Sequence, residues 1–170
     1  MNQRLLTTPR FSVEHRVYAR PDGRTFARDV VVHPGAVVIL PVLGDGRIVM
    51  IRNFRHTVEQ ELWELPAGTR EPSEVPLETA RRELEEEAGY RAQRWEPLAE
   101  FYTSPGVMTE RMYAFVATEL TSIRQRLEVD ESIVVCPVTE AETRRLLLSG
   151  EIIDGKSIAS LGLYFLRKAR

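Results

Sequence analysis

The chain has 170 residues, of which 43% are hydrophobic and 28% are charged, and its formal net charge is −2. This length allows one substantial core and is short for two, and the near-neutral charge gives no general attraction to nucleic acid or to an anionic membrane surface. The single cysteine excludes an intramolecular disulfide, and the absence of a secretion signal or membrane-length apolar segment leads us to expect a cytoplasmic protein.

The first third of the chain has the patterns of β-strands. Residues 11–18 and 25–32 alternate apolar and polar side chains, which predicts an antiparallel hairpin. The apolar run 36–43 and the segment 47–54 are also of strand length, and the short turn between them predicts that they pair antiparallel. The turn residues are Pro21-Asp22-Gly23 and Gly44-Asp45-Gly46. Residues 55–62 are polar and we expect them to be irregular.

A helix is predicted over residues 76–88. Pro76 suits the first helical position, and Gly89 is a natural C-terminal stop. Apolar residues recur at helical spacing and form one stripe, which consists of Leu77, Ala80, Leu84 and Ala88. We therefore expect this stripe to pack against a sheet.

The second half of the chain continues with strands and then helices. Residues 95–103, 112–118 and 133–138 are predicted strands, with an irregular loop between the first two. Residues 139–148 and 157–168 are predicted helices, the first capped by Thr139. The order of strands and helices indicates a mixed α/β (α+β) domain.

The predicted central helix carries a group of carboxylates. Glu83 and Glu87 are four residues apart and share a helical face, and Glu86 lies beside them. Oxygen ligands gathered in this way suit Mg²⁺ or Mn²⁺, and the carbonyl of Ala67 in the preceding turn is a further possible ligand. The alternative is a solvated acidic face that pairs with arginines such as Arg82.

The spacing of residues 68–90 resembles the Nudix box at every fixed position. The matching residues are Gly68, Glu74, Arg82-Glu83-Leu84, Glu86-Glu87, Gly89 and the apolar Tyr90, where an aliphatic residue is commoner. The resemblance implies a Nudix fold, which is a mixed β-sheet sandwiched between helices. It also implies that Glu83, Glu86, Glu87 and the Ala67 carbonyl bind divalent metal ions, Mg²⁺ or also Mn²⁺, that activate the attacking water.

Motifs outside the box resemble those of the ADP-ribose pyrophosphatase subfamily. They are Asn53-Phe54-Arg55, Trp63-Glu64-Leu65-Pro66-Ala67-Gly68, Ser104-Pro105-Gly106, Glu110-Arg111 and Asp154-Gly155-Lys156-Ser157. Pro105 follows Gly89 by sixteen residues, the spacing associated with ADP-ribose hydrolysis. Several of these motifs also occur in hydrolases of GDP-mannose and other nucleotide sugars.

The resemblance implies hydrolysis of the pyrophosphate bond of a nucleoside diphosphate sugar, with ADP-ribose giving AMP and ribose 5-phosphate. Glu86 is a catalytic candidate on the helix, and the general base is expected in a loop, with Glu131 as first choice and Glu128 as second. Either of these loop acids is equally explained as a solvated side chain. The candidate substrate-binding residues are Arg55, Glu64, Arg70, Pro105, Glu110 and Arg111, and a structural role is an alternative for Glu64.

The domain organisation follows from the same resemblance. Residues 1–33 are expected to form an additional antiparallel β-hairpin or small sheet for dimerisation, and residues 34–170 a Nudix hydrolase domain. We expect a homodimer in which both subunits contribute to the substrate site, with a small-molecule nucleotide sugar as substrate and neither nucleic acid nor membrane as a partner. The alternatives are hydrolysis of GDP-mannose or another nucleotide sugar, and a non-catalytic domain that senses ADP-ribose.

Overall fold

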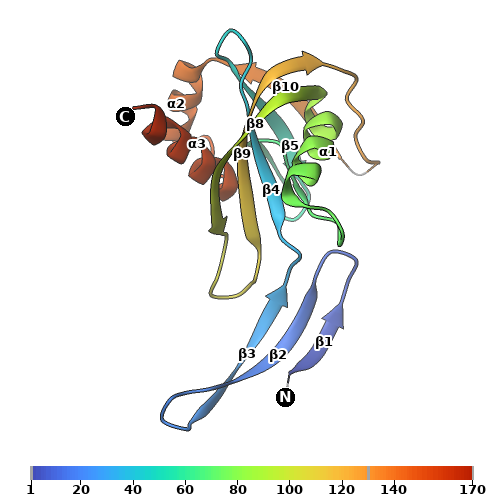
Figure 1. Ribbon diagram of the computed structural model, residues 1–170, viewed down its shortest axis with the longest axis vertical. Coiled ribbons are helices and arrows are strands. Elements are labelled where there is room, and N and C mark those ends of the chain that lie inside the picture. Colours follow the sequence, from blue (N-terminus) through green and yellow to red (C-terminus); the bar gives the residue numbers. More distant parts are fainter. Residues whose placement is uncertain (1, 130, 170) are drawn as a thin grey trace.

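The computed structural model describes residues 2–129 and 131–169. Its elements in chain order are β1 (Gln3–Thr7), β2 (Ser12–Ala19), β3 (Thr25–Val32), β4 (Ala36–Pro41), β5 (Ile48–Arg55), β6 (Gln60–Glu64), β7 (Ala67–Thr69), α1 (Pro76–Ala88), β8 (Tyr90–Tyr102), β9 (Arg111–Ser122), β10 (Ile133–Val138), α2 (Glu140–Leu148) and α3 (Gly155–Lys168). The strands form three sheets, in the orders β1-β2-β3, β10-β5-β6 and β7-β4-β9-β8. Figure 1 shows the first sheet as an arm below the body that holds the other two.

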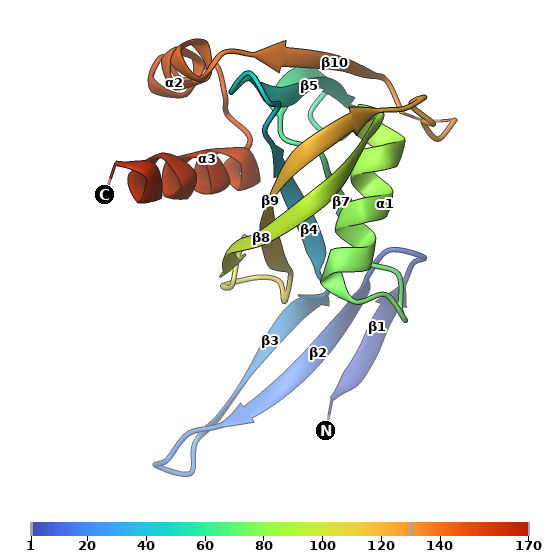
Figure 2. The same cartoon turned by 45° about the horizontal axis from the view of Figure 1, so that its top comes forward.

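The four-stranded sheet is the centre of the body. β4 pairs parallel with β9 and antiparallel with β7, and it is buried along its whole length. Its side chains alternate between two cores. Val37 and Ile39 pack with three residues of the apolar stripe of α1, whereas Val38 and Leu40 pack with residues of α3. The three stripe residues are Ala80, Leu84 and Ala88. Helices therefore cover both faces, and the predicted mixed sheet between helices is confirmed (Figure 2).

The predicted antiparallel pairing of residues 36–43 with 47–54 is wrong. β4 and β5 lie in different sheets, and the isolated bridge between Val42 and Ile48 is the part of the pairing that forms. β7 and β9 occupy the two edges of β4, so β5 crosses to a second sheet and pairs with β6 and β10. Residues 55–62, which we expected to be irregular, include the start of β6, a strand whose first residues are exposed.

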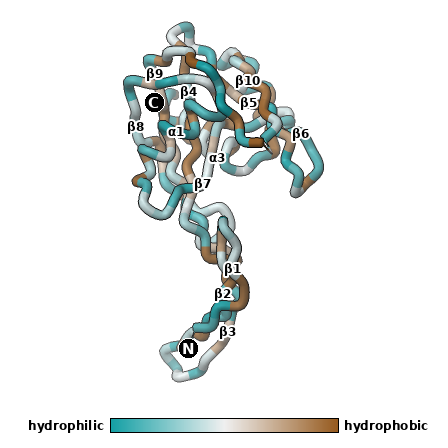
Figure 3. The backbone as a smooth tube through the Cα atoms, turned by 90° about the vertical axis from the view of Figure 1, so that its right-hand side faces the viewer, coloured by the Kyte–Doolittle hydropathy of each residue, from teal (hydrophilic) through white to brown (hydrophobic). Residues whose placement is uncertain are grey.

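The N-terminal arm contains the predicted hairpin and one further strand. β2 and β3 pair without interruption from Ser12↔Val32 to Ala19↔Thr25. β1 adds to the outer side of β2, and its short sequence has no alternation that could have indicated a strand. Figure 3 shows the arm as a narrow extension with apolar segments along it. The arm contacts the body near its last strand, where the Val31 N–H donates to Val107 O and Val31 O accepts from the Thr109 N–H.

The helices begin and end close to their predicted positions. α1 has the predicted bounds, and Gly89 ends it with φ +67° and an N–H that donates to Leu84 O. At the start of α2, Thr139 Oγ1 accepts from the Glu142 N–H. α3 begins two residues earlier than predicted, because the Asp154 carboxylate accepts from the Ser157 N–H and caps it. Over the described residues, no helix is long and apolar enough to cross a membrane.

Candidate active site

The inner face of α1 brings two carboxylates against β7. The Ala67 N–H donates to Glu87 Oε2 at 2.8 Å, and Glu87 is 3% exposed. Glu83 lies over Gly68, where an added Cβ would come within 1.9 Å of the Glu83 carboxyl carbon. Glycine at position 68 therefore leaves the space in which the Glu83 carboxylate lies against β7.

Arg82 joins the carboxylates of α1 to the loop before the helix. Its Nη1 donates to Glu83 Oε1 at 2.7 Å and to Glu86 Oε2 at 3.1 Å. Its Nε donates to Glu74 Oε1 at 2.9 Å. These hydrogen bonds lower the pKa of Glu74 to about 2 and raise the pKa of Arg82. One guanidinium thus donates to three carboxylates, so the cluster of Arg82 with Glu74, Glu83 and Glu86 keeps a net negative charge when the carboxylates are ionised.

The buried carboxylates have perturbed protonation equilibria. Burial raises the pKa of Glu83 to about 7, against the lowering effect of Arg82. Burial raises the pKa of Glu87 to about 8, and the charges of Glu83 and Glu131 add to the shift while the Ala67 N–H opposes it. Such a site favours either protons or a bound cation over free carboxylates.

The donor set fits a hard divalent cation in its chemistry. Glu83, Glu86 and Glu87 supply carboxylate oxygens, the ligands that Mg²⁺ prefers. As they stand, no three acidic, histidine or cysteine side chains of the described residues form a ready ligand group. Glu83 and Glu86 are paired with Arg82, and Glu87 is bonded to Ala67.

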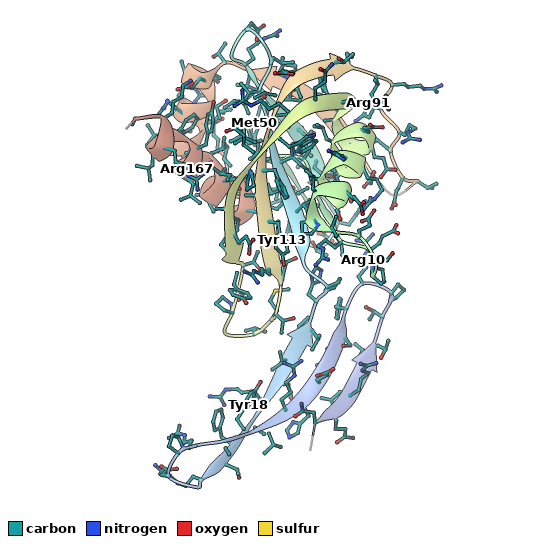
Figure 4. The ribbon with its side chains drawn as sticks, viewed as in Figure 1. Arg10, Tyr18, Met50, Arg91, Tyr113 and Arg167 are labelled. Carbon is teal, nitrogen blue, oxygen red and sulfur yellow. The ribbon has the colours of Figure 1, made fainter. Side chains whose placement is uncertain are left out.

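An acidic cleft of about 500 Å³ opens in front of these carboxylates. It brings together eight predicted site residues, which are Arg55, Ala67, Arg70, Glu83, Glu86, Glu87, Glu128 and Glu131. Pro9 and Arg10 from the turn between β1 and β2 also line it, and Figure 4 shows Arg10 at that turn near the start of α1. No local sequence pattern predicts that the arm lies here, because this neighbourhood arises only from the tertiary fold.

A second cleft of about 600 Å³ adjoins the first. Both are lined by Arg55 and residues 67–69, so they meet at β7. Glu110 lines the second cleft and accepts a hydrogen bond from Thr103 Oγ1 at 2.6 Å. Pro105 and Arg111 are among the linings of neither cleft. Pro105 lies in an exposed turn, and Arg111 pairs with Glu100.

Glu64 occupies a different position from the other predicted substrate-binding residues. Its side chain is fully buried, and it accepts from Arg55 Nε and Nη2 at 2.7 and 2.6 Å. Lys156 Nζ donates to it at 2.6 Å. The Glu64 hydrogen bonds raise the pKa of Arg55, against burial, which lowers it. Glu64 therefore holds Arg55 from beneath the clefts.

The loop before β10 contributes the two candidate bases. The Glu128 N–H donates to Glu131 Oε2 at 2.9 Å, and the Glu131 side chain is the less exposed of the two. Glu131 is near enough to raise the pKa of both Glu83 and Glu87. Asp130, between them, lies outside the described residues.

A family model described as the NUDIX domain matches residues 32–161. The chain belongs to the Nudix family. Nudix proteins typically use a divalent metal ion, in agreement with the oxygen-rich cleft. The match begins at residue 32, at the junction between the arm and the body.

Curated relatives and solved structures agree with this membership. The chain is 39% identical to the ADP-ribose pyrophosphatase of Bacillus subtilis over 88% of this chain and 82% of the relative. It is 35% identical to the methanol dehydrogenase activator of Bacillus methanolicus, with the same two coverages. It is 36% identical to the ADP-ribose pyrophosphatase of Mycobacterium tuberculosis over 89% and 74% of the two chains. These matches place the chain among the Nudix hydrolases.

The fold has a close structural counterpart. A crystal structure titled as an ADP compounds hydrolase superposes with a TM-score of 0.83, covers 96% of this chain and 89% of its own, and is 22% identical in sequence. At that identity the likeness concerns the fold, which includes both the Nudix body and the N-terminal strands.

Proposed function

We propose that this Nudix protein hydrolyses the pyrophosphate bond of ADP-ribose to AMP and ribose 5-phosphate. The observation that carries the proposal is the acidic cleft, in which buried Glu83 and Glu87 face β7 beside Arg55. Two relatives named as ADP-ribose pyrophosphatases, at 39% and 36% identity, support this choice among nucleotide sugars.

In this proposal Glu83, Glu86, Glu87 and the Ala67 carbonyl hold Mg²⁺ or Mn²⁺. The bound ion would neutralise diphosphate charge and lower the pKa of the attacking water. The protein contributes the position of the ligands. Gly68 lets Glu83 approach β7, the Ala67 N–H fixes Glu87, and Arg82 orients Glu83 and Glu86.

Arginines at the edges of the acidic cleft supply phosphate contacts. Arg55 lines both clefts, so we place the diphosphate at their junction. Arg70 lines the acidic cleft and is held by hydrogen bonds from its Nη1 and Nη2 to Pro34 O and Glu74 O. Glu131 is the proposed general base and Glu128 the second candidate, because both line the same cleft.

We further propose a homodimer that buries the arm. Large apolar side chains on the arm are more than a third exposed, among them Leu5, Leu6, Phe11 and Val17. Pro105 and Arg111, which line neither cleft of their own subunit, would then contact substrate held by the partner subunit. Light scattering on the full chain and on a variant that lacks residues 1–31 tests this, and a monomeric full chain contradicts it.

A substrate panel tests the activity. Purified protein with Mg²⁺ is offered ADP-ribose, GDP-mannose and other nucleotide sugars, and the phosphate released by an added phosphatase is measured. Preferred hydrolysis of ADP-ribose is expected, whereas strong activity on GDP-mannose with none on ADP-ribose would assign a different substrate. Tight ADP-ribose binding without hydrolysis of any substrate would indicate a sensor.

The metal-site assignment has a separate test. Glu86→Gln and Glu87→Gln should each abolish turnover while the folded structure is kept, because glutamine retains an oxygen acceptor but not the charge. Unchanged Mg²⁺-dependent hydrolysis in both variants would refute the assignment. Circular dichroism and thermal melts establish that each variant is folded.

A further inference from the structure

A group of ion pairs lies in the wall of the second cleft, which Arg55, Asp154 and Lys156 line, with Glu64 buried behind them. Glu64 is fully buried and pairs with two cationic side chains. Both of its carboxylate oxygens accept from Arg55, and Oε2 also accepts from Lys156 Nζ at 2.6 Å. Lys156 Nζ also contacts Asp154 Oδ1 at 2.9 Å. The side chains of Lys156 and Asp154 are 14% and 15% exposed, so this side of the group has little contact with water, whereas Arg55 is more open. Two carboxylates and two cations give it no net charge.

The same group joins the start of α3 to the strand that leads into the site. The Leu65 N–H donates to Ser157 Oγ at 2.7 Å, and Ser157 Oγ donates to Asp154 Oδ2 at 2.6 Å. Leu65 follows Glu64 and lies two residues before Ala67. The first turn of α3 is thus attached to this segment twice, once through a backbone N–H and once through Lys156.

Arg55 has two roles that compete for its charge. Its Nε and Nη2 are bonded to Glu64, and Nη1 takes part in neither bond. Its side chain is 39% exposed and lines both clefts, where an anionic substrate would meet it. If Arg55 were the sole cation on Glu64, its charge would be needed to offset that buried carboxylate, because an uncompensated buried charge is strongly unfavourable.

We propose that Lys156 is a positioning residue for substrate binding, which neutralises Glu64 so that Arg55 can direct its charge to the diphosphate. The inference rests on the proposed function at the same site. Lys156 acts through Glu64 and Arg55, since its ammonium is paired with the buried Glu64 carboxylate and with the partly buried Asp154 carboxylate. This role explains why a lysine at the start of α3, about a hundred residues after Arg55 in the chain, belongs to the site.

The chain supplies a matched control. Its two lysines are Lys156 and Lys168, and Lys168 pairs with Glu140 near the other end of α3. Lys156→Met and Lys168→Met therefore each remove one ammonium group from the same helix. Hydrolysis of ADP-ribose with Mg²⁺ is measured for both variants, for Lys156→Arg, for Glu64→Gln and for the double variant Glu64→Gln/Lys156→Met.

The expected result is a change in KM. Lys156→Met raises KM about tenfold, the order of one charge-assisted hydrogen bond, and leaves kcat within about threefold. Lys156→Arg recovers part of this loss, and Lys168→Met behaves as wild type. In the Glu64→Gln background, Lys156→Met changes KM less than threefold, because the carboxylate that it neutralises is gone.

Three results would overturn the inference. Equal KM values for Lys156→Met and Lys168→Met would show that the charge at Lys156 has no part in binding. A fall in kcat at unchanged KM would indicate a purely structural attachment of α3. An unreduced effect in the Glu64→Gln background would indicate a direct contact of Lys156 with substrate.

Failure of the proposed function would be recognised separately. If the wild-type protein does not hydrolyse ADP-ribose, the proposed activity falls, and the same variants are compared by calorimetric binding of ADP. The inference then requires weaker ADP binding by Lys156→Met than by Lys168→Met. Equal binding by the two, or no binding by the wild type, overturns it.

Discussion

The close approach of Glu83 to Gly68 makes Gly68→Ala a severe test of the site. An added Cβ would lie 1.9 Å from Cδ and Oε1 of Glu83 and 2.5 Å from its Oε2. Ordinary non-bonded contact needs about 3.5 Å, so the carboxylate must move by about 1.5 Å. The obstructing atoms are the far end of a flexible side chain, so the carboxylate can swing away while α1 and β7 stay in place.

The expected outcome is loss of metal binding in a folded protein. Changes that merely misorient a metal ligand weaken metal affinity about 10- to 100-fold, so displacing Glu83 should cost at least that. The free energy of unfolding should fall by no more than about 1 kcal/mol, which corresponds to about 2–4 °C in Tm. Titration of activity with Mg²⁺ gives the first quantity, and thermal melts give the second.

Gly162→Ala is the matched control, because nothing lies within 4 Å of its added Cβ in α3. It should leave the Mg²⁺ dependence unchanged and stabilise the helix by up to about 1 kcal/mol. Wild-type Mg²⁺ dependence in Gly68→Ala would refute the role of this contact. A large loss of Tm would instead show that the backbone, and not the Glu83 side chain, yields to the added methyl group.

Three further predictions concern protonation, metal and core. Burial raises the pKa of Glu83 to about 7 and of Glu87 to about 8, so the folded metal-free chain binds more protons than the unfolded chain and loses stability as pH rises from about 5 to 8. Mg²⁺ should therefore raise Tm more at pH 8 than at pH 6, and equal shifts would contradict this. Calorimetry in buffers of different ionisation enthalpy should detect proton release on Mg²⁺ binding at pH 6.5, which should be smaller in Glu87→Gln. Leu84→Ala, at a fully buried position, should cost about 2–5 kcal/mol in denaturant titrations, whereas Leu148→Ala, at a position 87% exposed, should change stability by less than about 0.5 kcal/mol.

Local patterns predicted the elements better than their pairing. The bounds of α1 follow from Pro76, Gly89 and one apolar stripe, and all of these signals are local. The partner of β4 does not follow from a local signal, because a turn between two apolar runs is equally compatible with a hairpin and with a crossing between sheets. β4 is buried on both faces and paired with β7 and β9 on its two edges, so tertiary packing leaves no edge of β4 for β5 although the turn between them forms.

For the site too, local spacing predicted which residues lie on one helix, but not the contacts that depend on the tertiary fold. The spacing of Glu83, Glu86 and Glu87 placed them on one helix, and the structure puts all three in one cleft. The sequence did not reveal that Glu64 would be buried under Arg55, since its motif is compatible with exposure or burial. The approach of Arg10 to the cleft depends on how the arm folds back, for which the sequence carries no periodic signal.

The crossing from β4 to β5 separates the chemistry from one end of the body. The turn at residues 43–47 connects the two sheets at one end of β4 (Figure 1). The clefts lie toward the opposite end, where Ala36 and Val37 line one cleft and Pro34 lines the other. A Cβ added at Gly44 or Gly46 would meet nothing within 4 Å. Because lengthening an exposed turn costs little loop-closure entropy, this turn is a suitable place to graft an epitope or a fluorophore-bearing peptide that reports on the enzyme without touching its clefts.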